Sequence, residues 1–204
     1  MSIYELHPTT WIRDGSDKPL SYQDLAHKLV KHCKVMGYTH VEPMALLEHP
    51  FEGSMGYHVT GFFSPNHRLG SVKDFKEFVD ILHQNDIGVI LDWVPAHFAK
   101  DKYSLEKFDG SSLYEARGLK HFVSLRHLFL GFGAHQFDFS RQDVRDFLIS
   151  SAAFWINEMH IDGLRVDCVR SILSSENQKE AQLFLKDLNA VVHSTGRGAI
   201  TIAE

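Results

Sequence analysis

Three acidic residues each follow a short run of mostly apolar residues, and they are the first candidates for chemistry. Asp92 follows Val-Ile-Leu, Asp167 follows Gly-Leu-Arg-Val, and Glu204 follows Ile-Thr-Ile-Ala. A carboxylate among such residues costs several kcal/mol if it is buried without a partner. Any one of these acids could simply end its strand and face water. Three acids in equivalent places indicate a shared cleft, because the carboxyl ends of parallel strands meet at one edge of a sheet.

An arginine accompanies one of these acids. Arg165 lies two residues before Asp167, and residues two apart on a strand share a face. An arginine beside a carboxylate favours its ionised form, so we expect a lowered pKa for Asp167, which suits a nucleophile. The alternative is a purely structural ion pair. Glu204 would then be the second carboxyl group of a retaining glycoside mechanism, which needs a separation of about 5–5.5 Å.

The segments that must position these residues alternate between two patterns. Short apolar runs predict five strands, at residues 3–7, 39–42, 88–94, 163–169 and 199–204. Apolar residues at helical spacing predict four helices between them, over 22–36, from Ser71, from near Ser140, and over 177–193. This order predicts an α/β fold with a parallel sheet and crossover helices. With no internal repeat or linker, we interpret residues 1–204 as one domain without a second.

Two of the predicted connections are far longer than the usual two to six residues. They span residues 44–70, after the second strand, and residues 95–139, after the third. Both leave the carboxyl end of a strand, and α/β barrels build their sites from loops at that end. The extra length therefore lies where we expect the chemistry.

The composition is that of an ordinary globular chain. Of 204 residues, 44% are hydrophobic and 23% are charged, which excludes disordered, collagen-like and coiled-coil chains. The net charge of −5 and scattered basic residues argue against nucleic acid as a partner. Two cysteines form no disulfide framework or zinc motif, so we expect no metal site. With no apolar run of about 18 residues and no secretory signal in residues 1–20, we expect no membrane contact and a cytoplasmic location.

Several motifs resemble one enzyme family. DWVPAHF at 92–98, DGLRVD at 162–167 and Ala203-Glu204 resemble the first three signature regions of the α-amylase superfamily, the thirteenth family of glycoside hydrolases. YELH at 4–7, EHPF at 48–51 and GYHVTG at 56–61 resemble the group of this superfamily that branches 1,4-α-glucans. The motifs occur in order over nearly the whole chain, which makes the set far more specific than any one of them.

The resemblance implies a (β/α)8 barrel of the TIM type, with only about the first five β/α units present. It implies a retaining mechanism without a cofactor, in which Asp167 is the nucleophile, Glu204 the acid/base and Arg165 the residue that holds the nucleophile. Tyr57, Asp92 and His97 match residues that line the subsite of the cleaved sugar. The substrate would be an α-1,4-glucan such as glycogen or amylose, and the product would carry α-1,6 branches. From the residues alone, Tyr57 could instead cover the core and His97 could cap a loop.

The chain also departs from a full barrel, which keeps other functions open. Five of eight strands are present, and the family's third catalytic acid lies on a later strand, so we expect little or no activity from this chain alone. One alternative is a non-catalytic or decayed glucan-binding remnant. Another is a different hydrolase of the same superfamily, such as a trehalose-forming enzyme. A remote further alternative is an unrelated phosphate-binding barrel. Nothing in the pattern sets the oligomeric state.

Five strands leave the first and the last without a neighbour, and such edges invite association. We therefore predict that the 204-residue chain, produced on its own, is unstable or aggregates. Size-exclusion chromatography combined with thermal unfolding tests this. A soluble monomer with a sharp cooperative melt would contradict it.

Overall fold

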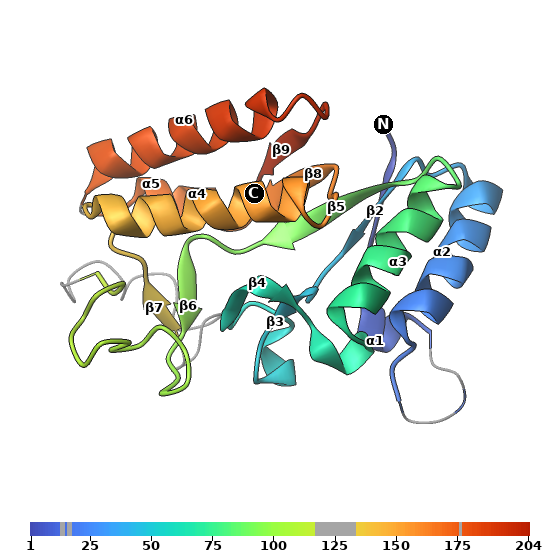
Figure 1. The fold of residues 1–204 in the computed structure, drawn as a ribbon, viewed down its shortest axis with the longest axis horizontal. Helices are drawn as coiled ribbons and strands as arrows, with labels where there is room; N and C mark the ends of the chain where they lie inside the picture. The colour runs from blue at the N-terminus through green and yellow to red at the C-terminus, as the bar shows by residue number, and fades with distance from the viewer. Residues whose placement is uncertain (13–14, 16–17, 117–133, 176) are drawn as a thin grey trace.

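A five-stranded parallel sheet forms the centre of the computed structural model, which describes residues 1–12, 15, 18–116, 134–175 and 177–204. All five predicted strands are present and parallel, so the predicted α/β class is confirmed. Figure 1 shows the strands running side by side, with β1 and β9 as the two edges. In spatial order they are β1 (Ile3–Leu6), β2 (His40–Pro43), β5 (Gly88–Trp93), β8 (Gly163–Val166) and β9 (Ile200–Ala203).

The four predicted helices are also present, and they pack in two pairs. Helix α2 (Tyr22–Met36) lies beside α3 (Val72–His83), and α4 (Gln142–Asn157) lies beside α6 (Gln178–Ser194) (Figure 1). Their apolar faces bury the outer side of the sheet. Short helices add to them, namely α1 (Pro8–Trp11), α5 (Val169–Leu173) and the 3-10 turns η1 (Glu52–Ser54) and η2 (His67–Leu69).

One predicted strand extended three residues too far, whereas the ends of the others differ by at most one residue. The strand expected to reach residue 169 ends at Val166, and α5 begins at Val169. Cys168 between them has a φ of 59°, in the left-handed region, which breaks the extended backbone. The chain therefore turns immediately after Asp167.

The two long connections contain strands that the sequence pattern did not predict. β3 (Leu47–Glu48) pairs antiparallel with β4 (Gly61–Pro65) in the first connection. β6 (His97–Ala99) pairs antiparallel with β7 (Ala134–Gln136) in the second. Figure 1 shows both small sheets beyond the carboxyl ends of the central strands. They form a second layer of structure around the place where the acids are expected.

The inner face of the central sheet changes character along the strands. Near the amino ends, Gly88 and Gly163 leave room for the side chains of the neighbouring strands. A Cβ on Gly88 would collide with the His40 ring, and one on Gly163 would lie 2.7 Å from Cγ1 of Ile200. Side chains two residues further along are larger, and those at the carboxyl ends are charged. No helix in the described residues is long and apolar enough to cross a membrane, and no acidic, histidine or cysteine cluster there could hold a metal ion.

A histidine and an aspartate join two elements at the amino end of the sheet. His83 Nε2 at the end of α3 lies 2.7 Å from Asp162 Oδ2, which also accepts a 2.7 Å hydrogen bond from the Val89 N–H on β5. The hydrogen bond to Asp162 raises the pKa of His83, although partial burial opposes this. The Asp162 carboxylate thus links α3, β5 and the turn before β8.

We predict that His83→Ala lowers the free energy of unfolding by about 0.5 kcal/mol near pH 6, a small value because solvent screens two partly exposed side chains. A histidine whose pKa is raised by folding stabilises fully below its unfolded pKa of about 6.5, and this is lost as the pH rises through the higher folded value. Thermal melts at pH 6 and pH 8.5 check this, measured on the polypeptide in the form that its source cells produce. The exposed His27→Ala is the control, and an effect of His83→Ala that grows with pH would contradict the prediction.

Candidate active site

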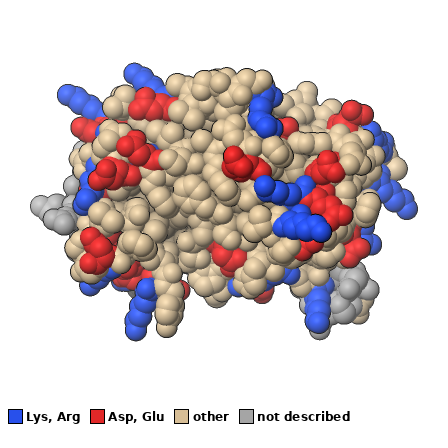
Figure 2. Space-filling view, in the orientation of Figure 1, with Lys and Arg blue, Asp and Glu red and all other residues tan. Residues whose placement is uncertain are grey.

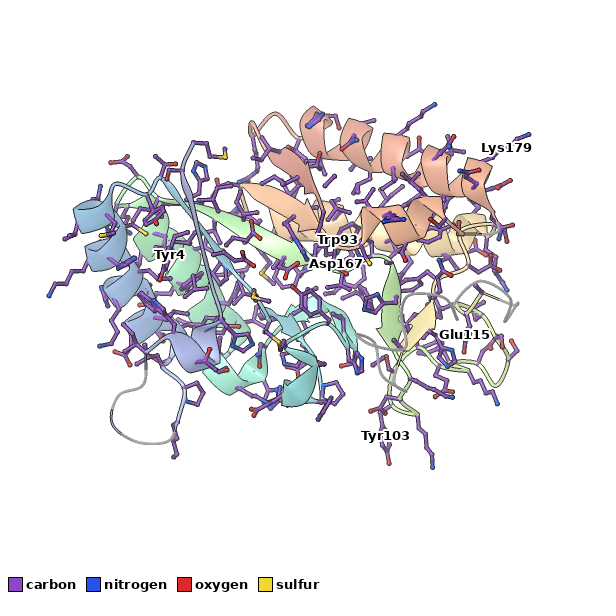
Figure 3. The ribbon with its side chains drawn as sticks, turned by 180° about the vertical axis from the view of Figure 1, so that it is seen from behind. Tyr4, Trp93, Tyr103, Glu115, Asp167 and Lys179 are labelled. Atoms are coloured by element: carbon purple, nitrogen blue, oxygen red, sulfur yellow. The ribbon has the colours of Figure 1, made fainter. Side chains whose placement is uncertain are left out.

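Two buried aspartates share one arginine at the carboxyl ends of β5 and β8. Asp92 and Arg165 are register partners on these strands. Arg165 Nη1 donates hydrogen bonds to Asp92 Oδ1 at 2.7 Å and to Asp167 Oδ1 at 2.8 Å. Asp92 is 5% exposed and Asp167 is 7% exposed. Figure 3 shows Asp167 beside Trp93 near the centre of the molecule, and the Asp167 N–H donates to the Trp93 carbonyl at 2.9 Å.

The electrostatic balance differs from the expectation for Asp167. Burial raises the pKa of Asp167 to about 6, the charge of Asp92 adds to this increase, and Arg165 opposes it. Arg165 lowers the pKa of Asp167 as expected, but the expected net lowering is wrong, because removal from water outweighs the one cation, which Asp167 shares with Asp92. Burial likewise raises the pKa of Asp92 against the effect of Arg165. Asp167 is still largely ionised at neutral pH.

Tyr57 closes one side of this network. It lies in the connection between η1 and β4, its side chain hydrogen-bonds to Asp92, and its ring centroid is 5.8 Å from the Arg165 guanidinium carbon. Burial and the Asp92 charge raise the pKa of Tyr57, so its hydroxyl stays protonated and can donate. The structure thus places Tyr57 with Asp92, Arg165 and Asp167.

His97 lies next to the same group but makes a backbone contact. This first residue of β6 is 1% exposed, and its Nε2 donates to the Tyr57 carbonyl oxygen at 2.9 Å. His97 therefore holds the segment that carries Tyr57. The role expected for it, a hydrogen bond to a sugar hydroxyl, stays a prediction.

Glu204 follows β9 and is exposed. Its Oε2 accepts a 2.7 Å hydrogen bond from the Cys168 N–H, and its own N–H donates to the Val166 carbonyl at 3.1 Å. Its charge contributes to the raised pKa of Asp167. The structure therefore brings Glu204 to the residues that surround Asp167, while the expected carboxylate separation stays a prediction.

The sequence analysis missed one acid of this region. Glu42 on β2 is 9% exposed, and burial, together with the charges of Asp92 and Glu5, raises its pKa to about 7. A signal was present, because Glu42, like the other acids, is a carboxylate at the carboxyl end of a predicted strand, residues 39–42.

The fold and these residues define a class. A parallel sheet with helices outside, acids at the carboxyl ends of its strands and long loops above them is part of a (β/α)-barrel with a carboxylate site. An α-amylase from Geobacillus thermoleovorans has this fold, with a TM-score of 0.75 and 21% identity over 99% of this chain and 46% of that one. The expected TIM-barrel type, present in part, is confirmed.

Sequence comparisons are more specific. No family model matches the chain. The chain is 44% identical over its whole length to a 1,4-alpha-glucan branching enzyme from Hydrogenovibrio crunogenus and 47% identical to one from Nocardia farcinica. It spans 30% and 28% of these two relatives. The chain is therefore related, from end to end, to one part of the 1,4-alpha-glucan branching enzymes, as the motifs predicted.

We predict that Arg165→Ala lowers the free energy of unfolding by about 3 kcal/mol at pH 7, because it leaves two buried carboxylates without their cation. Without the arginine the pKa values of Asp92 and Asp167 rise further, so the variant loses more stability as the pH increases. The difference from the unmodified protein should therefore shrink toward pH 5 in thermal melts. Arg170→Ala, an exposed arginine on α5, is the matched control, and equal losses in both variants would contradict the prediction.

Proposed function

We propose that this chain is part of the catalytic barrel of a 1,4-α-glucan branching enzyme. The enzyme would cleave an α-1,4 linkage with retention and transfer the released chain to a 6-hydroxyl of a glucan, which creates an α-1,6 branch. One observation carries this proposal, namely that Arg165 joins Asp92 and Asp167 at the carboxyl ends of two neighbouring barrel strands. The whole-length similarity to branching enzymes supports it.

In the first step, an Asp167 oxygen attacks the anomeric carbon of the glucosyl unit. Glu204, in its acid form, gives its proton to the departing 4-oxygen, so that the α-1,4 bond breaks and a glycosyl ester on Asp167 forms. Arg165 orients Asp167 through its 2.8 Å hydrogen bond during the attack. An ionised Asp167 fits this step, and the pKa of about 6 leaves it ionised at neutral pH.

In the second step, the Glu204 carboxylate removes the proton of a 6-hydroxyl on an acceptor glucan. The resulting oxygen attacks the anomeric carbon, the ester bond to Asp167 breaks, and Glu204 returns to its acid form. Tyr57 stacks against the bound sugar, and Asp92 and His97 contribute to the same subsite. Carboxyl groups perform both steps, so the proposed mechanism includes no cofactor and no metal.

The mixed charge of the surface is compatible with an uncharged polysaccharide as the substrate. Lysine and arginine side chains lie among acidic ones on the face in Figure 2, without a basic stripe. We propose an α-1,4-glucan such as glycogen or amylose as the partner, no nucleic acid or membrane, and a cytoplasmic location. The residues of this chain supply the proposed nucleophile and acid/base, and we expect little activity from them alone because a full barrel has eight strands.

We predict that Asp167→Asn reduces α-1,6 linkage formation by roughly four orders of magnitude, because the amide is a very poor nucleophile. The assay incubates amylose with the polypeptide as its source cells make it and counts α-1,6 anomeric protons by NMR. The exposed Asp143→Asn on α4 is the control and should keep full activity.

Two other results would replace this proposal. If the unmodified protein and Asp167→Asn both bind amylose but form no new linkage, the chain is a glucan-binding remnant. Release of short sugars without α-1,6 bonds would indicate a different hydrolase of the α-amylase superfamily.

A further inference from the structure

Glu42 faces the inner side of the sheet, where the proposed site lies. It is paired in register with Glu5 on the edge strand β1. On its other side, His40 is level with Gly88 of β5, which places Glu42 level with Ile90 and one inward-facing position before Asp92. Only 9% of Glu42 is exposed. A buried carboxyl group therefore lies diagonally next to Asp92.

The charges around Glu42 are almost all negative. Glu5 on β1 and Asp92 on β5 disfavour its ionised form, and Arg165 on β8 favours it. Arg165 is the only cation among these groups, and its Nη1 already donates to both Asp92 and Asp167. Tyr57 adds a hydroxyl to Asp92, and the Glu204 charge acts on Asp167. No hydrogen bond or ion pair of the Glu42 carboxyl is found among the described residues.

These contacts decide which acid carries a proton. A buried carboxylate without a partner takes up a proton in preference to remaining charged. Three buried carboxylates beside one guanidinium would leave two uncompensated negative charges in a site with little water. Asp92 and Asp167 each receive a charged hydrogen bond from Arg165, which stabilises their ionised forms. Glu42 receives none, so a proton on Glu42 relieves the repulsion at the lowest cost.

We propose that Glu42 is a positioning residue of this site, which carries a proton up to about neutral pH and thereby keeps Asp92 ionised and bound to Arg165. The pKa of Glu42, raised to about 7 by burial and by Asp92, supports this. Above that pH, ionised Glu42 adds a negative charge near Asp92, which competes for Arg165 and raises the proton affinity of Asp92. Ionisation of Glu42 therefore sets the upper end of the pH range in which the site is in its working charge state. Its catalytic meaning rests on the proposed function, but its protonation does not.

Glu42→Gln tests the proposal, because glutamine has the shape of a protonated glutamate and cannot ionise. The control is Glu5→Gln, which removes the register partner that lies on the exposed edge strand. Carboxyl carbons of protein labelled at glutamate are followed by NMR from pH 4 to pH 9. We expect a titration step near pH 7 in the unmodified protein, its loss in Glu42→Gln, and its retention, slightly lowered, in Glu5→Gln.

Thermal unfolding gives an independent readout with a defined sign. An acid whose pKa is raised on folding destabilises the fold as the pH rises from its unfolded value of about 4.3 to its folded value. Glu42→Gln removes this penalty. Its melting temperature should therefore exceed that of the unmodified protein at pH 8 and equal it at pH 4.5. The ratio of branching rates at pH 8.5 and pH 7 should also be larger in Glu42→Gln than in the unmodified protein.

Three results would overturn the proposal. They are a Glu42 carboxyl that titrates near pH 4–5, a step near pH 7 that persists in Glu42→Gln, and an equal loss of melting temperature at both pH values. If Glu42→Gln does not fold, glutamate-labelled unmodified protein decides alone, because a missing step near pH 7 rejects the proposal. Since the titration needs no glucan, a protein that makes no branches but shows the step would reject only the proposed function.

Discussion

Two buried aspartates and one guanidinium impose the main constraint on this molecule. Arg165 can reach both carboxylates only because β5 and β8 are neighbours in a register that places it level with Asp92. A shift of one residue would turn these side chains to the helix-covered face, where charged groups would lie among apolar ones. The ion network and the sheet register therefore depend on each other. The apolar outer face stabilises the register, and the register makes the charged inner face tolerable.

The inner face separates two tasks along the strands. At the amino ends, glycines let neighbouring strands and side chains approach closely, as Gly163 does with Ile200. At the carboxyl ends, carboxyl groups replace the packing residues, and their burial raises the pKa values of Glu42, Asp92 and Asp167. Close apolar packing is thus found at one end of the sheet and on its outer face. The other end accepts electrostatic strain that a reactive site can use.

The sequence pattern predicted the parts of the fold that repeat regularly and missed the parts set by individual contacts. The five strands and four long helices have clear apolar periods, so their order and parallel direction followed from the sequence. β3, β6 and β7 have only two or three residues, and β4 begins with glycine and ends in Ser-Pro, so only their pairing reveals them. The left-handed backbone of Cys168 lies just after the end of β8. It was not predicted, because cysteine as a residue type does not indicate a positive φ.

The site shows the same division, with one instructive error. Asp92, Arg165, Asp167 and Tyr57 were predicted and lie together, because motif spacing fixes which strand end or loop carries each. The pKa of Asp167 was predicted in the wrong direction, since spacing reveals the neighbouring arginine but not the water that folding removes. Glu42 was missed for a related reason. A carboxylate in a strand gains its meaning only when the burial and the charges of the neighbouring strands are known.

The two long connections are tied to each other before they meet any ligand. The Ala99 N–H donates to the Val59 carbonyl at 3.0 Å, and His97 donates to the Tyr57 carbonyl at 2.9 Å. Two segments about 40 residues apart in sequence thus hold one aromatic ring over Arg165 and Asp92. Under the proposed function, a ring fixed in this way would lose little further freedom when a sugar stacks on it, which favours binding. The two connections therefore preorganise this ring, because a backbone hydrogen bond and the His97 side chain hold the segment that carries Tyr57.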